Sequence, residues 1–213
     1  DDGSEYFGPY AYVKMLNTIL ETIGKIYPLR TCRYQLTEKN IKNKKFNVCL
    51  KYHIKKCAGP CVGLQSKEEY DENIKQIRSI IMGHISPVKK LMEEKMMKYA
   101  DELKFEEAQE IKEKIEVLNS YQSKSSVLSK NNLNLDVFSL TLKNNFYFVN
   151  YMKVVEGALI HVHTIEIKNV MDETEDYILT MIIPEMRSKY LSDAKEIIVP
   201  FLPSIQIEDV KYT

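Results

Sequence analysis

Apolar residues recur at helical spacing in two stretches near the start of the chain. Between residues 13 and 24 they fall three or four positions apart, and the stretch ends at Gly24, a residue typical of helix C-caps. Between 66 and 83 the same spacing follows Ser66 and Glu69, which together can form a capping box. Both stretches are therefore predicted to be helices. The first is too short to be stable alone and must pack against another element.

A longer helical pattern covers residues 88–121, directly after Pro87. Proline can begin a helix, whereas the residue before it is pushed away from helical geometry. The apolar positions change phase around Leu103 and Phe105, which predicts two antiparallel helices joined by a tight turn. The outer surface of this predicted hairpin is rich in acids and lysines.

From residue 135 the pattern becomes typical of β-structure, and a polar segment rich in Ser and Asn precedes it as a predicted linker. Turn residues, Asn144-Asn145 and Glu156-Gly157, separate the first three runs and suit hairpins. The order β-β-β-α-β predicts an α+β fold with a mixed sheet. The predicted strands, helix and further strands are 135–142, 146–155, 158–167, 173–190, 196–199 and 204–207.

All four cysteines lie close together, at Cys32, Cys49, Cys57 and Cys61, with the spacing C-x16-C-x7-C-x3-C. Their stretch has too few large apolar residues for a core, and small modules with that deficit usually fold around a metal or cluster. Four thiolates can hold zinc or an iron–sulfur cluster. Zinc sites usually show two close pairs, and here only the last two cysteines are close. Zinc, with His53 as a substitute ligand, and four reduced thiols stay as alternatives.

The whole chain is neutral, with 30 basic and 30 acidic residues, yet the cysteine-rich stretch is strongly basic. Ten Lys and Arg lie between Lys25 and Cys61, against one acid, Glu38. Basic residues mixed with aromatics favour sequence-independent nucleic-acid binding, and a solvated lysine-rich loop is the alternative. The candidate DNA-binding lysines are Lys42, Lys44, Lys45, Lys51, Lys55 and Lys56, with Tyr34, Phe46 and Tyr52 available to stack.

No apolar run approaches the roughly twenty residues that cross a membrane, and the chain opens without a signal peptide. We therefore expect a cytoplasmic protein without a membrane partner. The chain also begins without Met. We expect it to be a piece of a longer protein.

Three motifs resemble the UvrC family, nuclease subunits of bacterial nucleotide excision repair. Residues 6–10 (YFGPY) resemble the end of the family's GIY-YIG nuclease domain. Residues 29–63 follow its cysteine-rich signature, with a longer gap after Cys32 that we interpret as a surface insertion. Residues 91–118 resemble the UVR motif, a helical hairpin that docks on the UvrB helicase. The resemblance implies DNA repair in the DNA-damage (SOS) response, dual incision around lesions by the full-length protein, and a [4Fe–4S] cluster on the four cysteines.

The resemblance also assigns a partner-binding surface and domain boundaries. Phe105 is a large aromatic in a tight turn, poorly placed for a core and well placed as an interface anchor; an ordinary surface hairpin is the alternative. The predicted UvrB-binding residues are Leu103, Phe105, Glu106 and Ala108, and DNA would be met as damaged DNA in complex with UvrB. The predicted domains are 1–24 (nuclease-domain remnant), 25–66 (cysteine-rich cofactor module), 67–122 (helical region with the hairpin at 88–120), 123–134 (linker) and 135–213 (an inactive RNase H-like domain).

No catalytic residue is predicted. RNase H-type chemistry needs several carboxylates around paired metal ions. Asp136 stands at the start of its strand, and residues 200–203 (PFLP), directly after the strand at 196–199, contain no acid. His161 and His163 share a strand face but lack a carboxylate partner. One alternative function is a stand-alone zinc-binding UVR adaptor or regulator, and another is an autonomous nuclease that uses Asp136.

Overall fold

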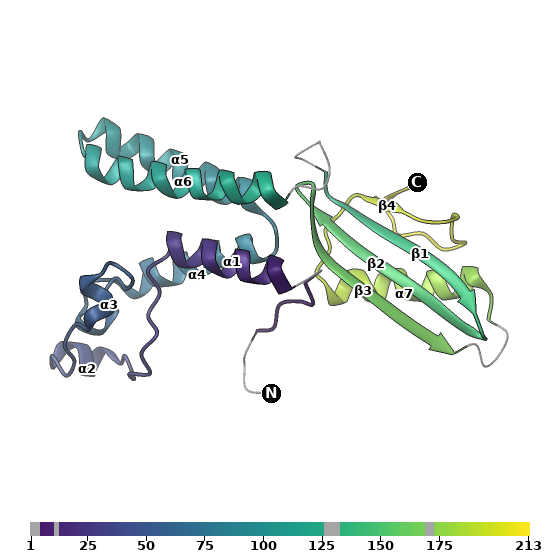
Figure 1. Cartoon of the computed structure of the whole chain (residues 1–213), viewed down its shortest axis with the longest axis horizontal. Coiled ribbons are helices and arrows are strands. Elements are labelled where there is room, and N and C mark those ends of the chain that lie inside the picture. The colour runs from purple at the N-terminus through teal and green to yellow at the C-terminus, as the bar shows by residue number, and fades with distance from the viewer. Residues whose placement is uncertain (1–4, 11–12, 126–132, 169–172) are drawn as a thin grey trace. The chain divides into compact units, whose positions relative to one another are not determined.

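The computed structural model describes residues 5–10, 13–125, 133–168 and 173–213 (Figure 1). The chain divides into two compact units. The helical unit contains residues 17–81 and 85–121, and the sheet unit contains the rest.

The helical unit is built from long helices with buried aliphatic faces, as the apolar spacing predicts. Among these faces, α1 buries Ile19 and Ile23, α4 buries Ile80, and α6 buries Ile115 and Leu118. Full burial of one such side chain contributes about 1.5–3 kcal/mol, so these faces hold together helices that would be marginal alone. The long helices are α1 (Val13–Ile26), α4 (Lys67–Ile81), α5 (Ile85–Asp101) and α6 (Phe105–Ser125).

Helix α1 continues past Gly24, so the predicted C-cap there is wrong. A side chain at Gly24 would meet open space, whereas Ile26 and Tyr27 just beyond it are buried. Burial of these two residues outweighs the roughly 1 kcal/mol by which glycine disfavours a helix interior.

Helix α4 begins with the predicted capping box. The backbone amide of Glu69 donates to the Ser66 hydroxyl, and the amide of Ser66 donates to the Glu69 carboxylate, both at 3.1 Å. Helix α5 begins at Ile85, two residues before Pro87, which was predicted to open it. Proline is tolerated there because first-turn amides have no partner within the helix.

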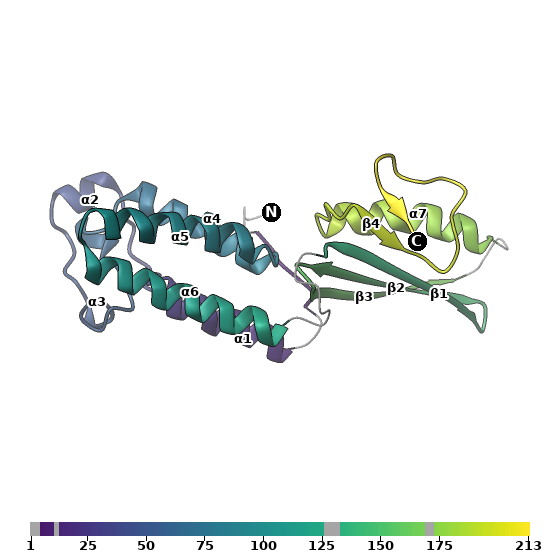
Figure 2. The ribbon, with the colours of Figure 1, turned by 90° about the horizontal axis from the view of Figure 1, so that it is seen from above.

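The sheet unit is a five-stranded mixed sheet in the order β3-β2-β1-β4-β5, with α7 against one face (Figure 2). Strand β1 pairs antiparallel with β2, β2 pairs antiparallel with β3, and β4 pairs parallel with both β1 and β5. The predicted α+β fold with a mixed sheet is confirmed. Its elements are β1 (Leu135–Lys143), β2 (Phe146–Val155), β3 (Ala158–Lys168), α7 (Glu175–Lys189), β4 (Glu196–Ile198) and β5 (Lys211–Tyr212).

Two-residue turns join the first three strands, as the turn chemistry predicts. Asn144 and Asn145 have φ values of 49° and 64°, and Glu156 and Gly157 have 49° and 78°. Left-handed geometry at both positions defines the turn whose twist matches that of paired strands. These turns fix the register of β1, β2 and β3.

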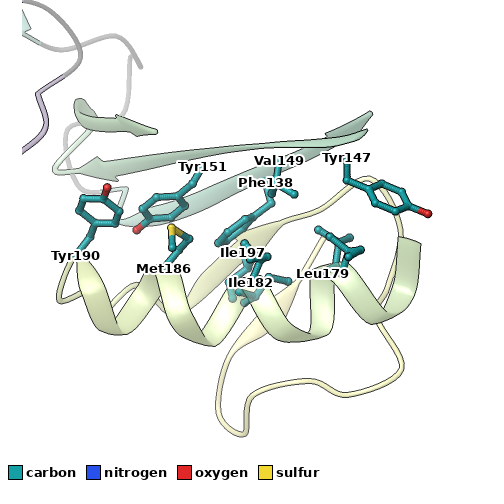
Figure 3. Close-up of a cluster of buried hydrophobic side chains, with 11 residues drawn as sticks. Phe138, Tyr147, Val149, Tyr151, Leu179, Ile182, Met186, Tyr190 and Ile197 are labelled. Atoms are coloured by element: carbon teal, nitrogen blue, oxygen red, sulfur yellow. The ribbon is translucent and has the colours of Figure 1, made fainter. Parts of the chain in front are cut away.

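The core of the sheet unit lies between the sheet and α7 (Figure 3). Alternate residues of β2 point to the same face, and Tyr147, Val149 and Tyr151 all meet the helix there. Helix α7 packs against this face of the sheet with residues three or four positions apart, including Leu179 and Met186. The helix is thus fixed along the sheet by a continuous apolar seam.

The predicted strand at 204–207 is wrong, because these residues form a loop and the last strand is β5. Backbone amides of this loop donate to side-chain oxygens instead of to a neighbouring strand. The Ser204 amide donates to the Asp176 carboxylate at 2.7 Å, and the Ile207 amide donates to the Tyr212 hydroxyl at 3.1 Å. With these donors satisfied locally, the chain pairs only at its last residues.

The predicted linker 123–134 begins later than expected, because α6 is helical through Ser125. Its residues 126–132 lie outside the described residues. Of the helices that the structure describes, none is long and apolar enough to cross a lipid bilayer.

Candidate functional site

The four cysteines lie on loops and short helices of the helical unit. Cys32 stands on the extended chain after α1, and Cys49 is the N-cap of α3 (Leu50–His53). Cys57 and Cys61 are buried, the latter inside the 3-10 helix η1 (Pro60–Val62), whereas Cys49 is exposed. All four are free thiols.

The turn between the two buried cysteines depends on Gly59. Its φ is +74°, and a Cβ there would lie 3.1 Å from the ring of Tyr52 and 3.2 Å from the side chain of Leu64. Glycine avoids both the left-handed strain and this crowding. The turn between Cys57 and Cys61 therefore has a form that few residues other than glycine would permit.

The four thiols lie near enough to influence one another. Burial raises the pKa of the Cys61 thiol, and negative charge on Cys32, Cys57 and Cys49 raises it further. These effects favour the neutral form of the Cys61 thiol until a cation or cluster neutralises the negative charge. In the part of the chain that the structure describes, no three His, Cys, Asp or Glu side chains are arranged to hold a metal ion. The donor chemistry therefore suits a soft metal or cluster, although the thiols are not drawn together around a centre.

The six candidate lysines are all exposed on the same module. Lys42 lies 3.4 Å from Glu38, the one acid of this stretch, and Lys55 lies 3.7 Å from Glu110 of α6. Exposed ion pairs of this kind contribute little to stability. The lysines are thus held in loose, solvent-facing positions that a polyanion could reach.

Two of the short helices end in the same backbone motif, with paired lysines in it. After α2 (Glu38–Lys42), the Lys45 amide donates five residues back at 3.0 Å, and Lys44 has φ +50°. After α3, the Lys56 amide does the same at 2.8 Å, and Lys55 has φ +57°. Cations near the last carbonyls of a helix are favourable. The positive charge of these lysines is therefore also favourable for the ends of the two helices.

The turn of the α5–α6 hairpin exposes two large apolar side chains. Helix α5 ends with the Lys104 amide donating to the Tyr99 carbonyl at 2.8 Å, and Leu103 takes a φ of +58°. Leu103 is 74% exposed and Phe105, the first residue of α6, is 64% exposed. The predicted tight turn is present, and its apolar residues face solvent.

The other residues of this turn have clear structural roles. Lys104 forms an ion pair with Glu102 at 2.7 Å and stands 5.8 Å above the centre of the Tyr99 ring. This contact lowers the pKa of Glu102 and raises that of Lys104. Glu106 is exposed, while Ala108 is buried. Ala108 thus belongs to the packed face of α6 and not to the exposed surface of the turn.

Asp136, on β1 of the sheet unit, is fully buried and has three partners. It accepts hydrogen bonds from the Tyr151 hydroxyl at 2.8 Å and the Ser192 hydroxyl at 2.7 Å, and it pairs closely with the Arg187 guanidinium. Arg187 also donates to the carbonyl of Ala194 at 2.9 Å. The carboxylate joins β1 to the end of α7, and its oxygens are occupied by these donors.

His161 and His163 of β3 both pack against Tyr190, with ring centroids 5.2 and 5.7 Å apart. The Nδ1 atom of His161 lies 2.8 Å from the Pro9 carbonyl oxygen. Burial lowers the pKa of both imidazoles, which favours their neutral forms. Within the described residues the pair has no third ligand for a metal; His161 is buried in the core, and His163 is half-buried at its edge.

Comparison with known proteins decides the family. Residues 1–80 match the middle domain of the UvrC/Cho excinuclease, and residues 134–210 match the UvrC Ribonuclease H-like domain. The chain is 46% identical over its whole length to the UvrABC system protein C of Bacteroides thetaiotaomicron. The chain belongs to the UvrC family.

Other UvrC relatives agree. The UvrABC system protein C of Flavobacterium johnsoniae is 47% identical over 94% of the chain, and that of Porphyromonas gingivalis is 40% identical over the same share. The chain spans 35%, 34% and 33% of the length of these three relatives. No solved structure matches the chain. Coverage of the whole chain by UvrC relatives counts against the alternative of a stand-alone adaptor.

Two buried charged residues of the UvrC RNase H-like unit were not predicted from the sequence. Arg187 lies on the buried face of α7, four positions after Ile183, and binds Asp136. Lys153 is 1% exposed on the inward face of β2 and donates to the carbonyl oxygens that follow α7, at 3.0 and 3.1 Å. Each charge interrupts an otherwise apolar repeat, and that interruption is the signal that could have identified it.

Proposed function

We propose that this chain is the central scaffold portion of a UvrC excinuclease that acts in bacterial nucleotide excision repair. In this proposal the α5–α6 hairpin binds UvrB, the basic cysteine-rich module contacts damaged DNA beside it, and the sheet unit cuts nothing. The full-length protein would make the dual incisions around a lesion with sites elsewhere in its chain. In this proposal the protein acts in the cytoplasm, where bacterial DNA lies.

The observation that carries this proposal is the exposed apolar turn of the hairpin. Three further helices, α2, α3 and α7, also end on non-glycine residues with left-handed geometry, so backbone strain alone is no signal of function. What distinguishes the hairpin turn is that Leu103 and Phe105, both largely exposed, stand within three residues of each other. Aromatic and aliphatic side chains on a rigid turn are typical anchors of protein interfaces.

The turn is also held in shape before any partner arrives. The backbone of the turn is tied to the end of α5, because the Lys104 amide donates to the Tyr99 carbonyl at 2.8 Å and the Leu103 amide donates to the Ala100 carbonyl at 3.0 Å. A preformed anchor loses less conformational entropy on binding than a mobile one. This favours the hairpin turn as a docking element over a loop that merely tolerates apolar residues.

We propose that Cys32, Cys49, Cys57 and Cys61 hold a [4Fe–4S] cluster, with zinc as the alternative. A bound cluster would supply a covalent crosslink among four points of a module that has few large apolar residues. The chain's own contribution is the Gly59 turn, which sets the two buried thiols, and the common neighbourhood of all four. The role is structural, because it orients the basic loops.

Metal and sulfide analysis tests the cofactor. The chain purified without oxygen should be brown, with a broad absorbance band and about four iron and four sulfide per chain. Cys57→Ser should lose most of the iron, whereas Ser204→Ala, at an exposed position of the sheet unit, should keep it. A colourless protein with one zinc per chain would contradict the cluster in favour of zinc. A protein with neither would contradict any cofactor.

Gel-shift analysis tests the function as a whole. When the chain is added to a preformed complex of UvrB with damaged duplex DNA, the complex should migrate more slowly in the gel. The DNA should stay uncut in the presence of Mg²⁺ or Mn²⁺. The expected shift follows from the exposed turn, and the intact DNA follows from the occupied Asp136 carboxylate. No further shift would contradict the scaffold role, and metal-dependent cutting would contradict the inactive sheet unit.

A further inference from the structure

Tyr34 and Phe46 form a stacked aromatic pair on the surface of the cysteine-rich module. Their ring centroids are 4.5 Å apart, and the ring planes differ by 11°. Tyr34 is 46% exposed and Phe46 is half-buried. Because Phe46 covers one face of the tyrosine ring, the exposed area belongs to the opposite face and the hydroxyl end. The module thus carries a flat ring that is supported from below and open to solvent.

The backbone on the Tyr34 side of the pair is fixed by side chains. The Arg30 guanidinium donates to the Tyr34 carbonyl at 2.9 Å. The side-chain amide of Asn40 donates to the Gln35 carbonyl at the same distance. The Thr37 hydroxyl caps α2 by accepting a hydrogen bond from the backbone amide of Asn40 at 3.2 Å. These bonds hold the loop between the tyrosine and α2.

The Phe46 side is fixed by the end of α2. The turn with Lys44 at φ +50° reverses the chain, and Phe46 follows directly after Lys45. The backbone is therefore fixed on both sides of the stacked pair, before α2 at Tyr34 and after α2 at Phe46. A binding surface that is already ordered loses little conformational entropy when a ligand arrives.

Cations flank both rings along the chain. Arg33 precedes Tyr34, and Lys44 and Lys45 precede Phe46. The only acid in this stretch, Glu38, is engaged by Lys42. A flat exposed ring bordered by positive charge is the combination that single-stranded nucleic acids require, because bases stack on the ring while phosphates meet the cations.

We propose that Tyr34 stacks on an unpaired base of DNA, with Phe46 supporting it from behind and Arg33, Lys44 and Lys45 meeting the adjacent phosphates. The inference rests on the DNA contact of the proposed function and names its substrate class. Bases inside a duplex have both faces covered, so only a strand that is opened or unstacked offers a free face. The module would thus bind the single-stranded part of its substrate more tightly than intact duplex.

Fluorescence anisotropy tests the inference with the whole chain, as purified without oxygen. The probes are an oligothymidine of about 12 nucleotides, which is within the usual length bound by one single-strand module, and a duplex of equal length. Tyr34→Leu keeps apolar bulk against Phe46 but removes the flat ring, and Tyr34→Phe keeps the ring. We expect Tyr34→Leu to weaken single-strand binding about fivefold or more, from a stacking contribution of about 1–3 kcal/mol. Tyr34→Phe should bind like the wild type, and duplex binding should be unchanged in both variants.

Lys45→Ala separates this inference from the proposed function. It should weaken binding to both probes and reduce the salt dependence by about one phosphate contact. Equal single-strand affinity of Tyr34→Leu and wild type would overturn the stacking role alone, as would a wild type that favours duplex. If the wild type bound neither probe, the DNA contact itself would fall. Circular dichroism should show the same melting of Tyr34→Leu and Tyr34→Phe, which excludes unfolding as the cause of a difference.

Discussion

Phe105→Ala should reduce the affinity of the chain for UvrB by about 30-fold or more, because truncation of an interface anchor costs about 2 kcal/mol or more. The side chain is 64% exposed at the start of α6, so its removal should leave the helical content and melting temperature nearly unchanged. Surface capture of UvrB by the immobilised chain measures the affinity, and circular dichroism monitors the fold.

The chain contains a matched control for the same turn. Leu103 and Leu191 both follow a helix end in left-handed geometry, at φ +58° and +48°, and are 74% and 66% exposed. Leu103→Ala should weaken UvrB binding, whereas Leu191→Ala, at the end of α7, should not. If both leucine variants and Phe105→Ala bound UvrB as the wild type does, the hairpin turn would not be the docking element.

Asp136→Ala should lower the free energy of unfolding of the sheet unit by about 3–5 kcal/mol, because it leaves the Arg187 guanidinium buried without its counter-charge. The Tyr151 and Ser192 hydroxyls lose their acceptor as well. Urea unfolding followed by circular dichroism measures the loss. The effect is large because total stabilities are only about 5–15 kcal/mol.

Two comparisons distinguish a structural Asp136 from a metal ligand. The double variant Asp136→Ala/Arg187→Met should recover part of the lost stability, because it removes the orphaned charge and restores apolar packing. Mg²⁺ or Mn²⁺ should leave the melting temperature of the wild type unchanged. Stabilisation of the wild type by metal, absent in Asp136→Ala, would instead identify a metal site and revive the possibility of catalysis.

Local turn chemistry made the hairpins of the sheet predictable. Asn144-Asn145 and Glu156-Gly157 adopt left-handed geometry at low cost, so the bounds of β1, β2 and β3 follow within a residue. The end of the chain was not predictable in this way. Strand β5 has two residues and exists through parallel pairing with β4, in which Glu196 faces Lys211 across an intervening loop, and no local pattern encodes this pairing.

The start of α4 was predictable because its cap is formed by side chains, whereas the end of α1 was not. The Ser66–Glu69 box fixes the start of α4 by its own hydrogen bonds. Gly24 looked like an end, yet the buried Ile26 and Tyr27 carry α1 beyond it. In that case burial outweighed a local preference of about 1 kcal/mol.

The candidate site was predictable as a set of residues and less so as a geometry. Spacing and charge indicated the cysteines, the lysines and the hairpin turn. They could not indicate that Tyr34 pairs with Phe46 across the turn after α2, or that Ala108 is buried. Arg187 was missed because apolar periodicity ignores a charge on a buried face whose partner is 51 residues away.

The recruitment of UvrB by the α5–α6 hairpin is the central claim, and calorimetric titration of UvrB with the chain at several temperatures tests it most directly. Burial of Leu103 and Phe105 should give saturable binding with a negative heat-capacity change, the reliable sign of apolar burial. That change should be smaller for Phe105→Ala and unaltered for Leu191→Ala. Absence of binding at micromolar concentrations, or a heat-capacity change that is the same in wild type and Phe105→Ala, would contradict the account.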